Sequence, residues 1–575
     1  MKKTILWYFA LCVIVTGIAI FLTATYRLPD QLTFSGGDGA LGEALIKSIQ
    51  ESGLKGNLFC DRLGAPDGSA LVDTPFLDWL FVIQAWIISW FVKNPGRIMV
   101  IFYVVTYVTS AVSMFFCLNK LKCSRGSSFI FSLLFSFSTF HTFRNIGHLT
   151  LSNYYIVPIA IYLSFYIAFN GVVDKVDSPF ANKNAKKNQV ILYLFAIMIG
   201  MANVYFTAFG LVFMLTALLY RLVKEGHIKQ NIKYAGYIFV GFLSFGVSLL
   251  PKWIYGIMNG VNEQGASRSF LHSEIFGLKL IQLLLPPYFS KFWGAYFVGK
   301  YEEGNSFISE NRLSAIGLIA VIAFIGLCIH LIISFIKKKG DCFIDFLSLS
   351  VLIAVLVATV GGFGTIFNYF VTPEIRCYCR ISIYIICFCY IAFAYVITKK
   401  KVRMPFRVLI FAVLLAIGGM DQITISNKDA WTGAGIQAEI YDSFFSQIEE
   451  KMPKGAMVYQ LPFIEFPEPA VTQIEGMDAY NHLEAYVFTD TIKWSYGGMK
   501  GRNESAKTLF VSNGIGTEFL QNIRKAGFLG VYINMSAYTD VQKTEVTQFY
   551  SEELQLTPIV SQDGLLYFYD ISNIK

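Results

Sequence analysis

One acidic residue, Asp38, stands in a glycine-rich stretch directly after the first hydrophobic segment of the chain. It belongs to TFSGGDGALG, residues 33–42, and the following ALGEALIKSIQ has helical periodicity, so Asp38 is expected at or near a helix start. Free backbone N–H groups stabilise a carboxylate there. Asp38 is then either a helix cap flanked by turn glycines, or a general base or metal ligand beside which the glycines let a substrate approach the backbone.

A second polar group, FHTFRNIGHLTLSNYY, begins at residue 140, at the end of the hydrophobic span 127–141. His141, Arg144 and His148 are spaced i, i+3 and i+7, so they share one face if the helix continues through them. An arginine flanked by two histidines suits the binding of a phosphate or diphosphate. The alternative is that these side chains only anchor the helix at the membrane interface.

Two arginines occur at the start of another apolar span. In TPEIRCYCRISIY, residues 372–384, Arg376 and Arg380 are four residues apart and are predicted on one face at the outer entrance of the span 377–397. They form either an anion site or a pair of side chains that extend to the membrane surface.

A fourth candidate lies near the C-terminus, in KWSYGGMKGRNES, residues 493–505. It combines aromatic residues, glycines and cations, and could bind an acidic or sugar ligand or form a polar turn packed against the membrane part. The candidate acceptor-binding or sugar-binding residues are Trp494, Tyr496, Lys500 and Arg502.

The elements that must position these residues are membrane helices. The 575 residues are 55% hydrophobic and 15% charged, with a mean hydropathy of +0.52, and apolar segments long enough to cross the membrane recur. Charged residues are almost absent from the middle of these spans, which argues against an ion relay in the membrane. The predicted spans are 5–24, 98–118, 127–141, 151–170, 190–204, 205–222, 234–252, 313–336, 343–364, 377–397 and 405–424.

The net charge of +8 reflects basic loops between the spans and indicates no nucleic-acid partner. The apolar segment 76–92 decides on which side these loops fall. If it lies in the interface without crossing, the basic loops 119–126, 174–188, 221–233, 337–341 and 399–403 are all cytoplasmic, as the positive-inside rule favours. We therefore expect 11 crossings, a retained N-terminal helix, a cytoplasmic N-terminus and an extracytoplasmic C-terminus.

The composition changes near residue 425, where the long apolar runs end and charge rises. Helical patterns alternate with the strand-like runs AMVYQLPF, LGVYINM and GLLYFYDI. We predict a polytopic α-helical membrane domain over 1–424, with extracytoplasmic loops 25–97 and 253–312, and an extracytoplasmic α/β domain over 425–575.

This arrangement resembles the GT-C superfamily of integral-membrane glycosyltransferases, and among them bacterial YfhO-type and surface-polysaccharide proteins. The resemblance rests on SGGDGALG, DRLGAPDGSALVDTPFLD, FHTFRNIGHLTLSNYYIVP, EIRCYCRIS and KWSYGGMKGR, which extend from residue 35 to 502. It implies a multi-pass protein of the plasma or inner membrane that moves a sugar, with inversion, from a polyprenyl-phosphate donor to a cell-surface glycan, teichoic acid or lipid.

The resemblance also implies roles for single residues. Asp38 would be the catalytic carboxylate, and the lipid phosphate would be bound by Arg376 and Arg380 with Arg144, His148 and His141. Many relatives carry two acids in the first outer loop, whereas GGDGA has one; Asp61, Asp67, Asp73 and Asp78 are later candidates for the second. A divalent metal, Mg²⁺ or Mn²⁺ with Asp38 as ligand, therefore stays open.

Two other functions stay open. A transporter or flippase of lipid-linked sugars typically shows inverted repeats and helices broken at mid-membrane. Neither pattern is visible, although the glycines 361–364 and the turn at 200–205 keep this alternative. A non-catalytic membrane partner that binds glycan would keep its function when Asp38 is replaced by Asn.

Overall fold

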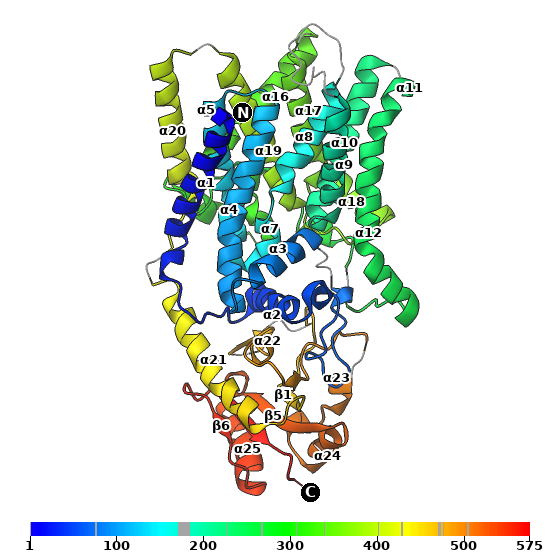
Figure 1. The fold of residues 1–575 in the computed structure, drawn as a ribbon, viewed down its shortest axis with the longest axis vertical. Coiled ribbons are helices and arrows are strands. Elements are labelled where there is room, and N and C mark those ends of the chain that lie inside the picture. The colour runs from blue at the N-terminus through cyan, green and yellow to red at the C-terminus, as the bar shows by residue number, and fades with distance from the viewer. Residues whose placement is uncertain are drawn as a thin grey trace.

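The hydrophobic segments of the sequence fold as helices that run side by side in one bundle, with a smaller domain at one end (Figure 1). The computed structural model describes residues 2–74, 78–170, 185–226, 228–265, 268–305, 307–338, 340–400, 402–426, 429–469, 473–474, 476–502 and 505–574. The basic loop predicted at 174–188 lies largely outside these residues.

Eight helices in the described part of the chain are long and apolar enough to cross a membrane. A helix of about 20 residues spans the ~30 Å hydrocarbon layer. These spans correspond to α1 (Lys2–Leu22), α4 (Pro95–Lys120), α8 (Ile156–Phe169), whose span begins at Ile146, α10 (Val204–Glu225), α12 (Ala235–Asn259), α16 (Leu318–Lys337), α19 (Ser382–Lys399), whose span begins at Tyr378, and α20 (Met404–Gln422).

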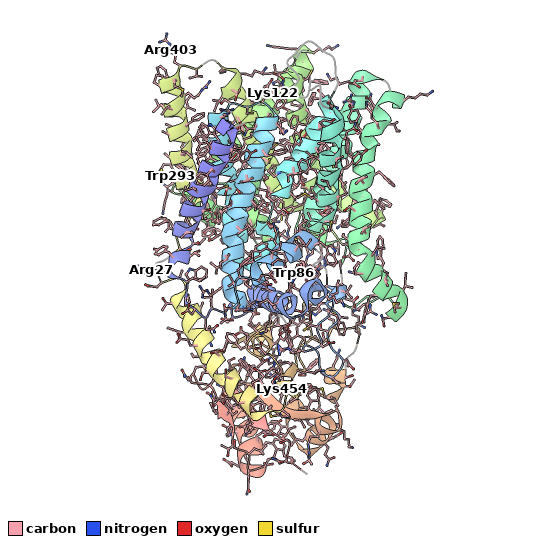
Figure 2. All side chains as sticks on the ribbon, viewed as in Figure 1. Arg27, Trp86, Lys122, Trp293, Arg403 and Lys454 are labelled. Atoms are coloured by element: carbon pink, nitrogen blue, oxygen red, sulfur yellow. The ribbon has the colours of Figure 1, made fainter. Side chains whose placement is uncertain are left out.

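Three shorter helices occupy the other predicted spans: α5 (Arg125–Ser136), α9 (Ala185–Met201) and α17 (Cys342–Ala358). Each of the 11 predicted spans thus contains a helix, while the number of crossings stays a prediction. Lys122 and Arg403 lie at the end of the bundle that carries the N-terminus (Figure 2), which is where the predicted topology puts basic residues.

The segment 76–92 forms the short helix α3 (Trp79–Ser89), and residues 75–77 lie outside the described part. Eleven residues measure about 16 Å, roughly half the hydrocarbon thickness. The helix lies at the end of the bundle next to the smaller domain (Figure 1), and its Trp79 indole donates a hydrogen bond to the Ser248 carbonyl at 3.0 Å. Its length fits a helix that does not cross.

Short elements cover this end of the bundle. From the first outer segment come η1 (Thr25–Arg27), α2 (Gly37–Ser52), η2 (Gly53–Asn57) and η3 (Leu71–Asp73). The later ones are α6 (Thr139–Arg144), η4 (Ile146–His148), α7 (Leu149–Ser152), α13 (His272–Ile275), α14 (Leu280–Leu284), α15 (Gly294–Glu302), η6 (Glu310–Ser314), α18 (Phe363–Phe370) and η7 (Tyr378–Ile381). At the opposite end lie α11 (Ile228–Asn231) and η5 (Ile232–Tyr234).

The smaller domain is built on a mixed five-stranded sheet of order β4-β1-β5-β7-β6. Its strands are β1 (Met457–Leu461), β4 (Lys493–Trp494), β5 (Phe528–Asn534), β6 (Ile559–Val560) and β7 (Leu566–Asp570), and a separate pair joins β2 (Gln473–Ile474) to β3 (Met477–Asp478). β1 runs parallel to β4 and β5, and β7 runs antiparallel to β5. The three strand-like runs of the sequence are β1, β5 and β7.

Helices surround this sheet: α21 (Thr432–Lys451), α22 (Leu483–Val487), α23 (Ser505–Leu509), α24 (Thr517–Lys525) and α25 (Asp540–Thr547), with the single turns η8 (Ser512–Gly514), η9 (Met535–Ala537) and η10 (Gln548–Glu553). The predicted domain division at 424/425 falls between the end of α20 and the start of α21. The predicted fold class, a helical membrane protein with a C-terminal α/β domain, is confirmed.

Polar contacts join the two parts. Arg62 of the first outer segment donates to the main-chain carbonyls of Tyr486 and Ile492 at 3.2 and 3.1 Å. Arg502 of the C-terminal domain donates two hydrogen bonds to the buried Asp73 carboxylate, at 2.5 and 3.1 Å. The C-terminal domain is thereby held against the outer loops of the bundle.

Candidate functional site

Asp38 occupies the second position of α2, in its first turn. The helix is capped by Gly36 and no side chain makes the capping bond, so the structural interpretation of Asp38 as a helix cap is wrong. The Asp38 Oδ2 atom is 3.1 Å from Nε2 of His148, and the two side chains are 49% and 37% exposed. A carboxylate and an imidazole therefore meet at the end of the bundle that contacts the C-terminal domain, where the α2 N-terminus also stabilises negative charge.

The glycines before Asp38 accommodate the C-terminal domain. Gly36 and Gly37 have φ of +87° and +56°, a region that favours glycine. A Cβ on Gly36 would lie 3.0 Å from the Cβ of Asp478, and the Gly37 N–H donates to Asp478 Oδ1 at 2.7 Å. These glycines could have let a substrate approach the backbone. In the structure it is Asp478 that makes this close approach.

The condition for a common face of His141, Arg144 and His148 is not met, because the helix that contains His141 and Arg144 ends before His148. α6 ends at Arg144, Asn145 takes a φ of +41°, and His148 closes the separate turn η4. His141 is fully buried, with Nε2 2.8 Å from the Thr106 hydroxyl. Four residues of chain still keep the Cα atoms of Arg144 and His148 within about 14 Å of each other.

Arg144 is completely buried and pairs with Glu310, which lies 166 residues later in η6. One Nη atom donates to the Glu310 carboxylate, and the guanidinium carbon lies 5.2 Å from the Phe140 ring centre. Within the described residues, its Nε and other Nη atoms have no hydrogen-bond partner. A buried guanidinium with unmatched N–H groups is a strong anion-binding group.

Arg380, which lies in η7, binds the same Glu310 carboxylate. Its Nε and Nη2 atoms donate to the two Glu310 oxygens at 2.7 and 2.8 Å. Burial raises the pKa of Glu310, but the charges of Arg380 and Arg144 outweigh it and hold that pKa well below its usual value. We call Arg144, Glu310 and Arg380 the inner cluster; it contains two cations and one anion.

Arg376 contacts a different carboxylate. Its Nη2 lies 3.4 Å from the Glu468 carboxylate. The Arg268 guanidinium donates two hydrogen bonds to the same carboxylate, at 2.9 and 3.1 Å. Lys500 donates to the Glu468 main-chain carbonyl at 2.8 Å. The predicted common face of Arg376 and Arg380 is wrong, because α19 begins only at Ser382. We call Arg268, Arg376, Lys500 and Glu468 the junction cluster.

An open cavity of about 380 Å³ borders the inner cluster. Its polar lining includes Thr142, Asn145, Tyr288, Glu310 and Arg312. A smaller cavity of about 140 Å³ shares Thr142 and Asn145 with it and extends to Trp431. The larger volume falls within the range of ligand pockets.

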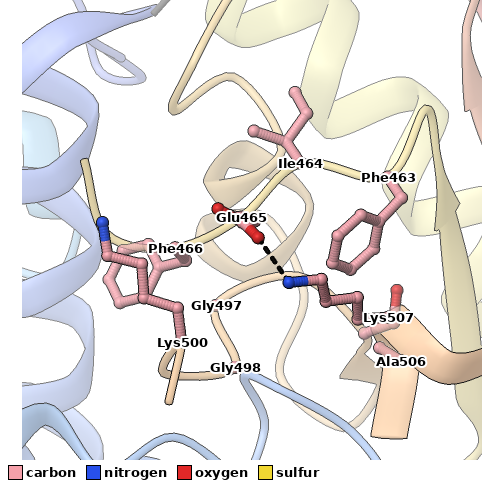
Figure 3. A pocket seen from close by; sticks show the side chains of 10 residues that line it. Phe463, Ile464, Glu465, Phe466, Gly497, Gly498, Lys500, Ala506 and Lys507 are labelled. Atoms are coloured by element: carbon pink, nitrogen blue, oxygen red, sulfur yellow. Dashed lines mark hydrogen bonds and ion pairs between the residues drawn. The ribbon is translucent and has the colours of Figure 1, made fainter. Parts of the chain in front are cut away.

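The aromatic residues of the fourth sequence candidate pack inside the C-terminal domain. Trp494 and Tyr496 are 0% and 4% exposed, and the Trp494 indole donates to the Thr489 hydroxyl at 2.8 Å. Lys500 lines a pocket of about 20 Å³ next to the Lys507–Glu465 ion pair (Figure 3), a volume that holds about one water molecule. Sugar binding by these residues and by Arg502 stays a prediction.

Few protein side chains stand near Asp38 as further metal ligands. Asp38 and His148 supply two ligands, Asp73 is paired with Arg502, and Asp78 caps α3 by accepting from the Phe81 N–H at 3.0 Å. In the part of the chain that the structure describes, no group of three or more His, Cys, Asp or Glu side chains could hold a metal ion. Mg²⁺ usually binds one or two protein carboxylates and completes its shell with waters and substrate phosphates, so the divalent metal at Asp38 stays a prediction.

Sequence reasoning missed four of the charged residues that organise this end of the molecule: Arg268, Glu310, Arg312 and Glu468. All four lie in the predicted extracytoplasmic segments. Their position on that side was the available indication, but neither spacing nor periodicity links them to their partners.

No protein-family model and no curated protein matches this sequence. Solved structures with some similarity include the apo oligosaccharyltransferase of Archaeoglobus fulgidus, at 12% identity and a TM-score of 0.46 over 99% of this chain and 75% of that one. The mycobacterial arabinofuranosyltransferase AftD aligns at 11% identity and 0.47, over 97% of this chain and 41% of that one. ArnT of Cupriavidus metallidurans, bound to undecaprenyl phosphate, aligns at 8% and 0.37, over 100% and 99%. At these values the similarity alone carries no argument about activity.

Proposed function

We propose that this protein is a membrane glycosyltransferase of the GT-C type. It transfers a sugar, with inversion, from a polyprenyl-phosphate donor to a surface glycan, teichoic acid or lipid on the extracytoplasmic face. The observation that carries the proposal is the Asp38–His148 pair, a half-exposed carboxylate held at 3.1 Å from an imidazole. It lies at the end of the bundle where the C-terminal domain docks.

The proposed chemistry is a single displacement at the anomeric carbon. The acceptor hydroxyl oxygen attacks this carbon while the bond to the donor phosphate oxygen breaks, and the bonding pair leaves with the phosphate. Asp38 takes the proton of the hydroxyl as general base. His148 orients the Asp38 carboxylate through their contact, so that one oxygen is left for the acceptor.

The inner cluster is the proposed site of the donor phosphate. Negative charge grows on this phosphate as the sugar leaves, and guanidinium groups fixed in a site of low polarity stabilise it. Arg144 has unpartnered N–H groups, Arg380 is adjacent through Glu310, and Arg312 lines the neighbouring cavity. Arg376 contacts Glu468 instead and is therefore left out of this phosphate site.

The test uses the full-length protein in liposomes with an undecaprenyl-phosphate-linked labelled sugar and a cell-envelope extract as acceptor. Release of undecaprenyl phosphate together with label transfer is expected from the wild type. Asp38→Asn should lower the rate by about 10²–10⁴ because the base is lost. Asp30→Asn, which changes an exposed acid of the same predicted outer segment, is the matched control and should keep the rate.

Two outcomes would overturn the proposal. If Asp38→Asn turns over as fast as Asp30→Asn, Asp38 is not the base. If labelled sugar crosses the membrane with its bond to the carrier intact, the protein is a transporter of lipid-linked sugars.

A further inference from the structure

The junction cluster gathers three cations around one acidic residue. Arg268 and Arg376 both contact the Glu468 carboxylate, and Lys500 contacts its main-chain oxygen. Among the printed contacts of the described residues, this one carboxylate balances one of the three positive charges. Such an excess favours the binding of a further anion.

The positive potential is also felt by a neighbour. Burial lowers the pKa of His272, and the charges of Arg376 and Arg268 lower it further. His272 lies in α13, and its ring Nδ1 accepts a hydrogen bond from the Ser269 N–H at 3.3 Å. It therefore adds a polar group without compensating the charge.

The cluster is open enough for a ligand to reach it. The side chains of Arg376 and Glu468 are 28% and 37% exposed. The Arg268 side chain is only 6% exposed, so its guanidinium is held in a fixed position. Lys500 holds its ammonium on the side of the pocket away from the Lys507–Glu465 pair (Figure 3). The exposed member, Glu468, is thus the one that can move.

Glu468 is held in an unusual backbone conformation, with φ of +49°. Residues in this region cost free energy unless their surroundings fix them. Here the Glu468 N–H donates to the Tyr480 hydroxyl at 3.3 Å, and the carboxylate reaches the two arginines. The carboxylate occupies the position that an incoming phosphate or carboxylate would take.

Tyr480 connects this cluster to the proposed catalytic acid. Burial raises the pKa of Tyr480 to about 12, and the nearby charges of Asp38, Glu468 and Asp478 add to the rise. Asp478 in turn accepts from the Gly37 N–H, next to Asp38, at 2.7 Å. Tyr480, which accepts from the Glu468 N–H, thus also lies within the electrostatic influence of Asp38.

We propose that Arg268, Arg376 and Lys500 form a binding site for a phosphate group of the acceptor, and that the Glu468 carboxylate fills this site until the ligand displaces it. Two of the four cluster residues, Glu468 and Lys500, belong to the C-terminal domain, whereas the inner cluster is built from the bundle and its loops. Assigning the ligand to the acceptor rests on the proposed function; the anion site itself does not.

The experiment measures binding of inorganic phosphate to the full-length protein in lipid nanodiscs at constant ionic strength. Arg268→Gln should weaken binding roughly tenfold, because a forked charged donor is lost. Glu468→Gln should strengthen it several-fold, because the competing charge is removed. Lys507→Gln removes the same charge as Arg268→Gln from a neighbouring ion pair and should leave binding within about twofold.

The sign of the Glu468→Gln effect is decisive. A carboxylate with a purely structural role would give weaker or unchanged binding, and either result would overturn the site, as would equal losses in Arg268→Gln and Lys507→Gln. Differential hydrogen exchange of the folded state checks that each variant keeps the wild-type fold.

A second arm separates the two sources of phosphate. Saturating undecaprenyl phosphate in the nanodiscs should not displace inorganic phosphate from this site; displacement would assign the site to the donor and overturn the acceptor assignment. This binding is measured with neither a sugar donor nor an acceptor present. Failure of the proposed transfer reaction would therefore leave this binding result intact.

Discussion

The inner and junction clusters are built alike, but they differ in how easily the central glutamate can move away from its arginines. In each, one glutamate joins two arginines that come from distant parts of the chain. The Glu310 side chain is 18% exposed and its partners are 1% and 13% exposed. Glu468 is 37% exposed and its partners 6% and 28%. Burial is the main difference.

This difference assigns each carboxylate a different role. Glu310 accepts from three groups, namely both arginines and the Cys377 thiol at 3.2 Å, so its removal leaves two largely buried arginines without their shared counter-charge. Glu468 faces solvent on one side and is held by a longer contact to Arg376, at 3.4 Å. The inner carboxylate fixes the arginines, whereas the outer one can exchange with a ligand.

The largest expected effect comes from removing the inner carboxylate. Glu310→Gln leaves the fully buried Arg144 without its counter-charge and should lower the free energy of unfolding by about 3–5 kcal/mol. Glu468→Gln should cost about 1 kcal/mol or less, because solvent screens that site. Unfolding in mixed detergent micelles compares the two variants, and equal losses would break the distinction between the clusters.

A buried acid that is not paired with an arginine should change the stability with pH in the direction opposite to Glu310. Glu43 in α2 accepts from the Thr33 hydroxyl and the Phe34 N–H, at 2.9 and 2.8 Å, and burial raises its pKa to about 7. In the unfolded chain this proton is lost near pH 4.5, because the Glu43 carboxyl then has the ordinary glutamate pKa. Stability should therefore fall as pH rises from about 4.5 to 7, by roughly 3 kcal/mol for this group.

The difference between wild type and Glu43→Gln isolates this effect from other acids. The variant should gain stability over the wild type above pH 7 and match it near pH 4.5. Glu310 has a lowered pKa, so its stabilisation is present above the unfolded value and is lost only as pH falls through the folded one. A pH-independent difference between Glu43→Gln and the wild type would contradict the assigned burial.

These contrasts also explain what the sequence could predict. Hydropathy is a local property, so all 11 apolar spans contain helices, and the glycines before Asp38 correctly indicated the start of α2. The break after Arg144 was missed because Asn145, which is neither glycine nor proline, adopts a positive φ; asparagine tolerates this conformation better than most residues.

Ion-pair partners were beyond sequence reasoning for a different reason. Arg144 and Glu310 are 166 residues apart, and Arg376 and Glu468 are 92 apart. Their contacts depend on how whole segments pack, which no spacing rule encodes. The sequence located the arginines on the outer side but could not divide them between two carboxylates.

A smaller effect is expected at the contact between α2 and the C-terminal domain. Gly36→Ala adds a Cβ 3.0 Å from Asp478 at a φ of +87°, so it should cost about 1–2 kcal/mol through strain. The change loosens the C-terminal side without touching the inner cluster. Hydrogen exchange should increase in α2 and stay unchanged in α6; increased exchange in both would mean that the two regions unfold together.

The smallest effect should come from Arg376. Its contact with Glu468 is long and partly exposed, so Arg376→Gln should lower the free energy of unfolding by less than about 1 kcal/mol, and less still in high salt. Arg380→Gln, which loses two bonds of 2.7 and 2.8 Å to Glu310, should cost more at every salt concentration. Unfolding measured at about 0.1 M and 1 M NaCl, where the Debye length falls from about 10 to 3 Å, tests both statements. If Arg376→Gln proves costlier than Arg380→Gln, or keeps its full cost in high salt, then the junction cluster is the rigid one and Glu468 cannot give way to a ligand.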